Sequence, residues 1–266
     1  MITRVSALAL AALGLAGAAL ADCDADGRVE IYPTAEVLPE NLLRIYVYFP
    51  HPMDTSQGVE IVQLLDAAGD PVEHVFLRNR DDLWSPDRRR LTVLLDPGRV
   101  KTGLEAHDAL GRALVPGQSY AFEVSGRALQ ADGCALGAST RHAFQVGPAD
   151  LEPPQPSSWQ LAPPQADTTD NLEVALGSAH DHLSLAFRLR VLDGEGTIVP
   201  GAIALGPGEA SWNFTPRAEW RIETYTLAID ERLEDLAGNR PGLLFDRPLD
   251  QPPSPWVPSV PFMPVE

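Results

Sequence analysis

The sequence predicts an all-β protein built from two tandem antiparallel β-sandwich modules. Short runs of alternating apolar and polar residues follow one another from about Arg28 onward, and Pro, Gly, Asp and Asn separate them. The chain also contains an internal repeat. Beyond the first segment, helical periodicity does not extend over ten or more residues, so residues 101–114 could hold a turn or two of helix at most.

Alternation is clearest in two runs, residues 44–49 and residues 184–191. The first run places Ile45, Val47 and Phe49 on one face and Arg44, Tyr46 and Tyr48 on the other. The second run places Leu185, Phe187, Leu189 and Val191 inward and Arg188 and Arg190 outward. Each strand is therefore expected to turn one face to a core and the other to water.

The internal repeat appears when 127 is added to a residue number. The offset needs no gap between Ile45 and Val72, and it shrinks further on because the first copy has a longer loop at residues 98–117. The matched pairs are Ile45–Leu172, Val47–Val174, Phe49–Leu176, Asp54–Asp181, Asp66–Asp193, Gly69–Gly196, Val72–Val199, Tyr120–Tyr225, Phe122–Leu227 and Val124–Ile229. Two copies of one fold are therefore expected.

The repeat sets the domain boundaries. Residues 22–148 form the first expected domain and residues 156–248 the second, and a proline-rich linker at residues 149–155 should be extended and semi-rigid. Each copy has a full set of inward-facing strand residues, so each is expected to fold alone. Residues 249–266 form a proline-rich tail that is expected to be disordered or polyproline-like. The alternative is a tail that docks its aromatic residues on the protein or on a partner.

The first twenty-one residues have the features of a secretory signal peptide. Arg4 precedes an apolar run at residues 5–20, and Ala19-Leu20-Ala21 has the small-x-small pattern of a cleavage site. A transmembrane anchor is the alternative, but the run is barely long enough and meets the acidic Asp22. We therefore expect residues 1–21 to be removed and the mature protein to be periplasmic, at the cell surface or secreted.

Only two cysteines, Cys23 and Cys134, remain after cleavage. An isolated pair in an oxidising compartment is expected to form a disulfide, here between the N-terminal segment and the turn before the last strand of the first module. Two cysteines cannot complete a tetrahedral zinc site by themselves.

Free-thiol labelling tests this pairing directly. The mature protein, denatured without reductant, should show almost no reactive thiol, because Cys23 and Cys134 are joined. Finding two reactive thiols in that experiment would contradict the disulfide.

Five short motifs bear on the family. The first copy contains Phe-Pro-His-Pro-Met-Asp at residues 49–54, Leu-Trp-Ser-Pro-Asp at 83–87 and Leu-Val-Pro-Gly-Gln-Ser-Tyr at 114–120, and the second contains Trp-Asn-Phe-Thr-Pro at 212–216 and Asp-Leu-Ala-Gly-Asn at 235–239. Together they resemble the bacterial Ig-like domain named after the S-layer protein SbsA. The resemblance implies an Ig-like sandwich and an accessory role in an exported or surface protein, and it implies no catalytic residue or ligand.

Three residues in these motifs have expected structural roles. Tyr120 follows Pro116-Gly117 and is the candidate for a tyrosine corner, in which a buried ring donates or accepts a hydrogen bond through its hydroxyl. Asp54 and Asp235 are expected to accept hydrogen bonds from backbone N–H groups at turns.

The negative net charge and the absence of known catalytic motifs reduce the classes of function that are expected. The net charge of −17 repels phosphate backbones and anionic lipids, so nucleic-acid and membrane-surface binding are not expected. The sequence has no G-x-S-x-G, H-E-x-x-H, phosphate-loop or dinucleotide motif. Asp81 and Asp82 lie beside several arginines and could form an acid–base pair, but such dense mixed charge is typical of a solvated salt-bridge patch. No catalytic residue and no cofactor are expected.

Two clusters could hold a metal, and neither is expected to. Residues 22–27 have the D-x-D-x-D-G opening of a calcium loop, but Pro33 stands at the twelfth position, where a bidentate Glu belongs. His180 and His182 flank Asp181, and His51 lies in the corresponding loop of the first copy. The repeat offset preserves only the aspartate of this cluster, which favours a turn-capping role.

The leading hypothesis is a non-catalytic binding or scaffolding protein of the periplasm or cell surface, acting on an unidentified protein or envelope polymer. The alternative is a hydrolase or metal-dependent enzyme with its site in the groove between the modules.

Overall fold

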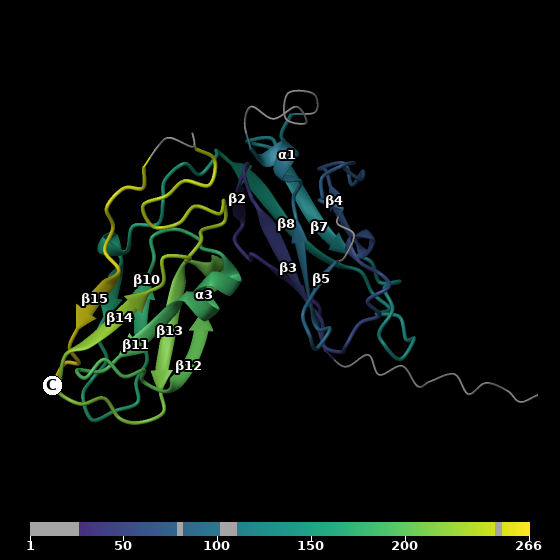
Figure 1. Cartoon of the computed structure of the whole chain (residues 1–266). Helices are drawn as coiled ribbons and strands as arrows, with labels where there is room; N and C mark the ends of the chain where they lie inside the picture. The colour runs from purple at the N-terminus through teal and green to yellow at the C-terminus, as the bar shows by residue number, and fades with distance from the viewer. Residues whose placement is uncertain (1–26, 79–81, 102–110, 248–251) are drawn as a thin grey trace, which may run out of the picture.

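The structure is a computed structural model that describes residues 27–78, 82–101, 111–247 and 252–266. The first module contains strands β1 (Glu30–Tyr32), β2 (Val37–Pro39), β3 (Arg44–Tyr48), β4 (Val62–Leu65), β5 (Leu83–Trp84), β6 (Arg90–Leu94), β7 (Ser119–Val124) and β8 (Thr140–Gly147), with helices η1 (Val59–Ile61) and α1 (Pro97–Val100). Its two sheets have the strand orders β1-β3-β6-β5 and β2-β8-β7-β4 (Figure 1).

The second module repeats this plan. It contains η2 (Pro156–Ser158), β9 (Gln160–Ala162), β10 (Leu172–Ala175), α3 (His182–Arg188), β11 (Leu189–Leu192), β12 (Gly201–Leu205), η3 (Pro207–Glu209), β13 (Ser211–Pro216), β14 (Tyr225–Ile229) and β15 (Ser259–Phe262). Its sheets have the orders β12-β13-β10-β9 and β11-β14-β15. Apart from the parallel β2–β8 pair, the paired strands run antiparallel. The all-β fold class with two Ig-like sandwiches is therefore confirmed.

The repeat is visible in individual turns. The Asp66 carboxylate accepts from the backbone N–H groups two and four residues later at 2.9 Å each, and Asp193 does the same at 3.0 and 2.8 Å. Gly69 and Gly196 follow with φ of +88° and +80°, a conformation that favours glycine. Both turns therefore close by the same hydrogen bonds.

The prediction of a strand over residues 184–191 is wrong for its first part and correct only from Leu189 onward. Residues 182–188 form α3, and β11 begins only at Leu189, so Phe187 points to solvent and is 58 % exposed. Asp181 explains the difference, because its carboxylate accepts from Ser184 N at 2.9 Å and caps the helix. Under the 127 offset β11 coincides with β4, so the repeat located the strand better than the local alternation did.

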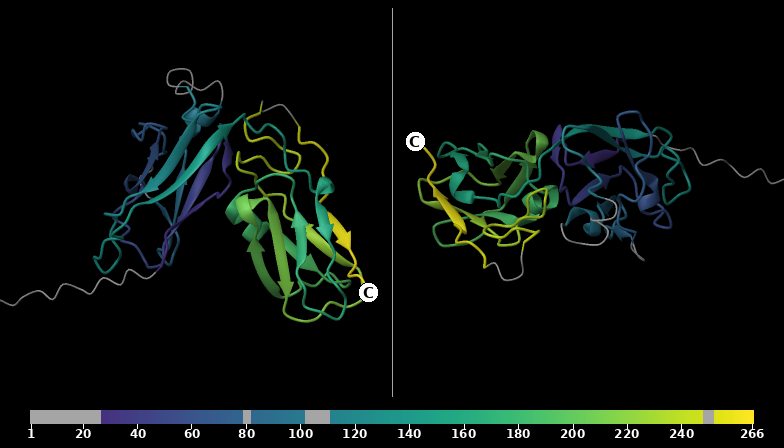
Figure 2. Two further views of the ribbon diagram at one scale, coloured as in Figure 1. Left: turned by 180° about the vertical axis from the view of Figure 1, so that it is seen from behind. Right: turned by 90° about the horizontal axis from the view of Figure 1, so that it is seen from above.

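The expectation of a disordered tail is also wrong for its last residues. β15, the yellow strand near the C-terminus in Figure 2, pairs with β14. Phe262 is 7 % exposed and packs against Trp220 and Tyr225. Pro261 fits there because β15 is an edge strand that needs hydrogen bonds on one side only. The second sandwich therefore extends beyond residue 248 and is completed by the tail.

Candidate functional site

The outward face of β3 is covered by the second module. Tyr46 is 2 % exposed, and its hydroxyl donates to Asp181 Oδ2 at 2.8 Å. Arg44 Nε lies 3.4 Å from the same oxygen, and the Arg44 guanidinium also pairs with Glu234. The prediction that this face of the strand meets water is therefore wrong, because a neighbouring domain supplies the polar partners.

The acidic groups at this joint are held by several donors each. Asp181 accepts hydrogen bonds from the Tyr46 hydroxyl and from Ser184 N in its own helix, and it forms an ion pair with Arg44. Arg240 donates to Glu234 Oε1 through two nitrogens at 2.9 and 2.7 Å. Burial raises the pKa of Asp181, although the Arg44 charge opposes this, and burial together with the Asp181 charge raises the pKa of Tyr46. The arrangement is that of a structural ion-pair network, since each of these groups is already engaged with a partner.

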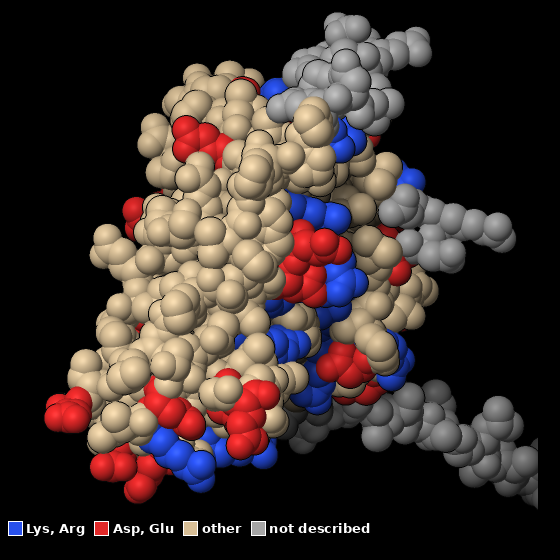
Figure 3. Space-filling view, turned by 60° about the vertical axis from the view of Figure 1, so that its left-hand side comes forward, with Lys and Arg blue, Asp and Glu red and all other residues tan. Residues whose placement is uncertain are grey.

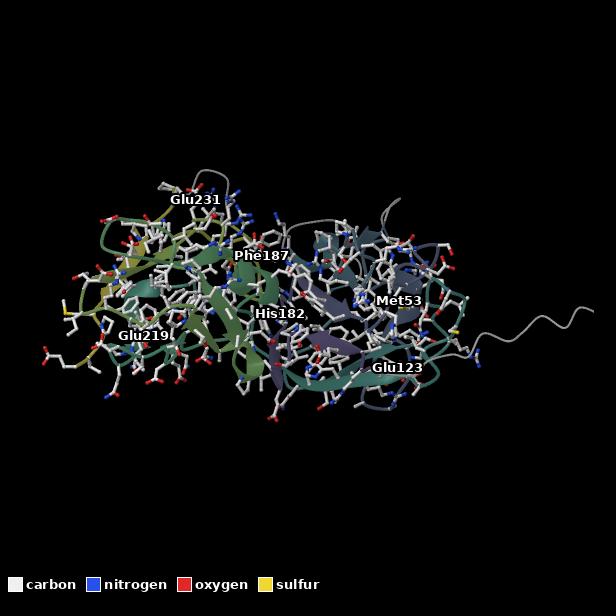
Figure 4. The ribbon with its side chains drawn as sticks, turned by 90° about the horizontal axis from the view of Figure 1, so that it is seen from below. Met53, Glu123, His182, Phe187, Glu219 and Glu231 are labelled. Carbon is white, nitrogen blue, oxygen red and sulfur yellow. The ribbon has the colours of Figure 1, made fainter. Side chains whose placement is uncertain are left out.

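A second contact between the modules brings aromatic rings together. The His182 ring lies 3.8 Å from the Tyr32 ring and 5.5 Å from the Tyr48 ring, measured between centroids. Below it, Glu209 is 1 % exposed and accepts from Thr34 N at 2.7 Å. Figure 4 shows His182 and Phe187 where the two modules face each other.

A third contact ties down the linker. Asn41 and Asp150 exchange two hydrogen bonds through the Asn41 amide, at 2.9 and 2.8 Å, and Asn239 donates to the Asp150 carbonyl at 3.2 Å. Leu43 N donates to Leu236 O at 3.0 Å, and the Leu236 side chain packs into the core of the first module. These contacts fix the relative orientation of the two sandwiches.

A groove of about 610 Å³ runs along this joint. Figure 3 shows blue basic atoms interleaved with red acidic ones in a band where the two modules meet. The groove is lined by five arginines, two acids and four other residues: Arg44, Arg90, Arg188, Arg232, Arg240, Asp181, Glu234, Tyr46, Leu183, Ser184 and Phe187. Sequence reasoning missed this cluster, because its members come from both modules and carry no shared motif.

The candidate histidines lie in different surroundings. His180 is 1 % exposed, contacts Ser178 O through Nδ1 at 3.0 Å and packs against Trp159. His182 lies between the tyrosine rings with Glu209 at 3.5 Å. No group of three or more His, Cys, Asp or Glu in the described residues could hold a metal. That the His180-Asp181-His182 cluster binds no metal stays a prediction.

His180 gives the protein a pH-dependent stability. Burial lowers the pKa of His180 to about 4, and the Nε2 atom has no hydrogen-bond partner among the described residues. Between pH 6.5 and 4 the unfolded chain therefore binds a proton that the folded chain does not. The contribution of His180 to the free energy of unfolding should therefore fall by about 3 kcal/mol over this window as the pH is lowered.

Denaturant titrations at several pH values check this expectation with the His180→Gln variant. The variant should be less stable at pH 7.5, and its stability should change less than that of the parent between pH 6.5 and 4. The same dependence on pH in both proteins would contradict the assignment. Asp235, whose pKa burial raises to about 7, acts in the opposite direction in both proteins and cancels in the difference.

The remaining predicted residues are placed as follows. Asp82 accepts from Val59 N at 3.1 Å and is a loop-fixing residue, whereas Asp81 lies outside the described residues. Residues 1–21, the calcium-like segment up to residue 26, and Cys23 also lie outside them. Cys134 is 4 % exposed in the turn before β8, as expected, and its pairing with Cys23 stays a prediction. His51 is half-buried.

The turn-capping prediction is confirmed, and the tyrosine corner lies in the other module. Asp54 accepts from Ser56 N at 3.0 Å, and Asp235 accepts from two backbone N–H groups at 2.8 and 2.9 Å. The Tyr225 hydroxyl accepts a hydrogen bond from Arg221 N at 3.1 Å. Tyr120 is only half-buried and stacks on a neighbouring ring, so it does not form the expected corner.

Comparisons with known proteins assign no family to the chain. Neither a family model nor a curated protein matches the chain. A structure of native α2-macroglobulin from Escherichia coli, spanning domains MG0-NIE-MG1, is 10 % identical over 89 % of this chain and 71 % of that one, with a TM-score of 0.27. Domains 1–6 of surface layer protein SbsC are 12 % identical over 70 % of this chain and 22 % of that one, also at 0.27. A chimeric titin Z1Z2 is 10 % identical over 76 % and 89 %, at 0.22.

None of the helices in the described ranges has the length and apolar character needed to cross a membrane.

Proposed function

We propose that this chain is an exported, non-catalytic binding or scaffolding protein of the periplasm or cell surface, built from two Ig-like modules of the SbsA type. The observation that carries the proposal is the joint between the modules. Tyr46 and Glu209 are buried there and Arg44 is half-buried, all three in contacts that cross from one sandwich to the other. Such a joint holds two binding surfaces at a fixed distance and angle, which suits a scaffold better than a hinged pair.

Spin-label distance measurements test the rigid joint. Labels placed at the exposed positions Arg127 and Arg217, one in each module, should give one narrow distance distribution in the full mature chain. The variant Tyr46→Ala should broaden it, because the hydroxyl and ring that hold Asp181 are lost. A broad distribution in the parent protein would contradict the scaffold, and recovery of the native protein in the cytoplasmic fraction would contradict export.

A further inference from the structure

Both modules carry a groove, and the two grooves are lined by equivalent positions of the repeat. The first has a volume of about 460 Å³ and the second about 340 Å³. Val62 and Val72 line the first, and their partners under the 127 offset, Leu189 and Val199, line the second. The first groove therefore serves as an internal reference for changes in the second.

The second groove has lost acidic residues. Glu60 of the first groove corresponds to Phe187, and Glu73 corresponds to Pro200. Gln63 corresponds to Arg190, which adds positive charge. Because the two modules share one fold, this difference reflects the surface rather than the needs of the sandwich. The second groove has become apolar and basic in a chain that is strongly acidic.

Large apolar side chains are exposed around this groove. Phe187 and Ile198 are each 58 % exposed, and Ile203 is 38 % exposed. Isolated apolar residues are common on protein surfaces, but a group of them beside one groove marks an interaction site.

The groove borders β12, the end strand of its sheet, which also lies beside helix α3. Within the described residues β12 pairs only with β13. Its sequence, Gly-Ala-Ile-Ala-Leu, carries no charge and no proline, although exposed edges are usually blunted by such residues. An unblunted edge offers backbone N–H and C=O groups to an extended peptide segment.

The apolar groove continues into the arginine-lined groove at the joint, because Phe187 lines both. Five arginines line the groove at the joint. Three carboxylates form ion pairs with these arginines: Asp181, Glu234 and Asp230. Arg90 has no carboxylate within 4 Å among the described residues, and its Nε is buried without a hydrogen-bond partner. Two positive charges therefore remain for an incoming acidic group, with arginine geometry suited to a carboxylate.

We propose that the second module binds an extended segment of a partner protein, which adds a strand to β12, places apolar side chains against Phe187, Ile198 and Ile203, and sends an acidic residue into the arginine-lined groove. The proposal rests on the proposed binding function and names the chemistry of its partner. The end strand β12 points to a peptide backbone, and the excess of arginines over carboxylates in the groove points to the acidic flank.

Selection from a displayed library of random twelve-residue peptides on the full mature chain tests this proposal. The selected pool should be enriched in alternating apolar residues with Asp or Glu on one side. Ile203→Lys should weaken binding of the pool at least tenfold, since it charges the docking edge. Val37→Lys is the matched control, because Val37 is 56 % exposed on β2, an edge strand of the first module, and it should leave binding unchanged.

A second pair of variants tests the arginines. Arg90→Gln combined with Arg232→Gln should remove the preference for acidic residues, and Arg217→Gln, an exposed arginine outside both grooves, should not. Thermal unfolding confirms that each variant is folded, and Ile198→Lys replaces Ile203→Lys if the latter is not. Failure of the pool to converge, or equal binding by Ile203→Lys, overturns the docking edge.

Two further outcomes are decisive. A converged pool without acidic residues overturns the arginine contribution. Binding of polygalacturonate that requires Arg90 and Arg232 but tolerates Ile203→Lys would assign the groove to an acidic sugar and overturn the peptide proposal. These results leave the spin-label distances and the fractionation untouched, so a failure here is distinguishable from a failure of the proposed scaffold.

Discussion

Replacing Phe262 by alanine is expected to lower the free energy of unfolding of the second module by about 3–5 kcal/mol. The ring is 7 % exposed and lies 5.7 Å, between centroids, from both Trp220 and Tyr225. Its removal leaves a cavity that the neighbouring rings cannot fill by a small shift. Chemical denaturation monitored by tryptophan fluorescence measures the loss.

Met263→Ala is the matched control, because its side chain is 51 % exposed on the next position of the same segment. It should change stability by less than about 0.5 kcal/mol. Equal effects at the two positions would show that β15 does not hold its place in solution. For the same reason, a fragment of residues 153–266 should be more stable than one of residues 153–248, in which β14 loses its partner strand.

Replacing Arg44 by alanine is expected to destabilise the protein by about 3–5 kcal/mol. The change leaves Asp181 and Glu234, whose side chains are 5 % and 13 % exposed, without their cation from the first module. Glu234 keeps its ion pair with Arg240, but the buried Asp181 keeps only neutral donors, Tyr46 and the Ser184 N–H group, so most of the loss is expected at Asp181. Denaturant unfolding of the full chain measures the loss.

Arg141→Ala is the control for this change, because Arg141 pairs with Glu123 across neighbouring strands but is 58 % exposed. An exposed pair contributes about 1 kcal/mol or less. The double variant Arg44→Met with Glu234→Gln should recover part of the stability lost in Arg44→Ala. If Arg44→Ala costs no more than Arg141→Ala, the joint between the modules is wetter than its burial indicates.

Local patterns in the sequence predicted the elements that depend on neighbouring residues. The Asp66 and Asp193 turns, the caps at Asp54 and Asp235, and the strand cores of both modules follow from a few adjacent positions. The repeat predicted β11 correctly where alternation placed a strand too early, because it compares two copies under the same structural demands.

The joint between the modules could not be predicted in this way. Arg44 and Tyr46 have the pattern of the solvent-facing side of any amphipathic strand, and only the position of Asp181 in space shows that Tyr46 is buried and Arg44 half-buried. The prediction of a disordered or polyproline-like tail failed for a similar reason. The prolines of the tail argue against a central strand, but they are compatible with the edge position that β15 takes. Both errors arise because burial by a distant segment leaves no local signal.

The Leu236 side chain, contributed by the second sandwich to the core of the first, makes the two modules energetically dependent on each other. The Leu43 amide, which donates to Leu236 O, is protected from hydrogen exchange only while that donated segment stays in place. Opening of the second sandwich should therefore expose an amide in the first, and a pulling force on either module would be shared by both. In the full chain the two modules are expected to unfold together in one cooperative transition, and not as two independent domains.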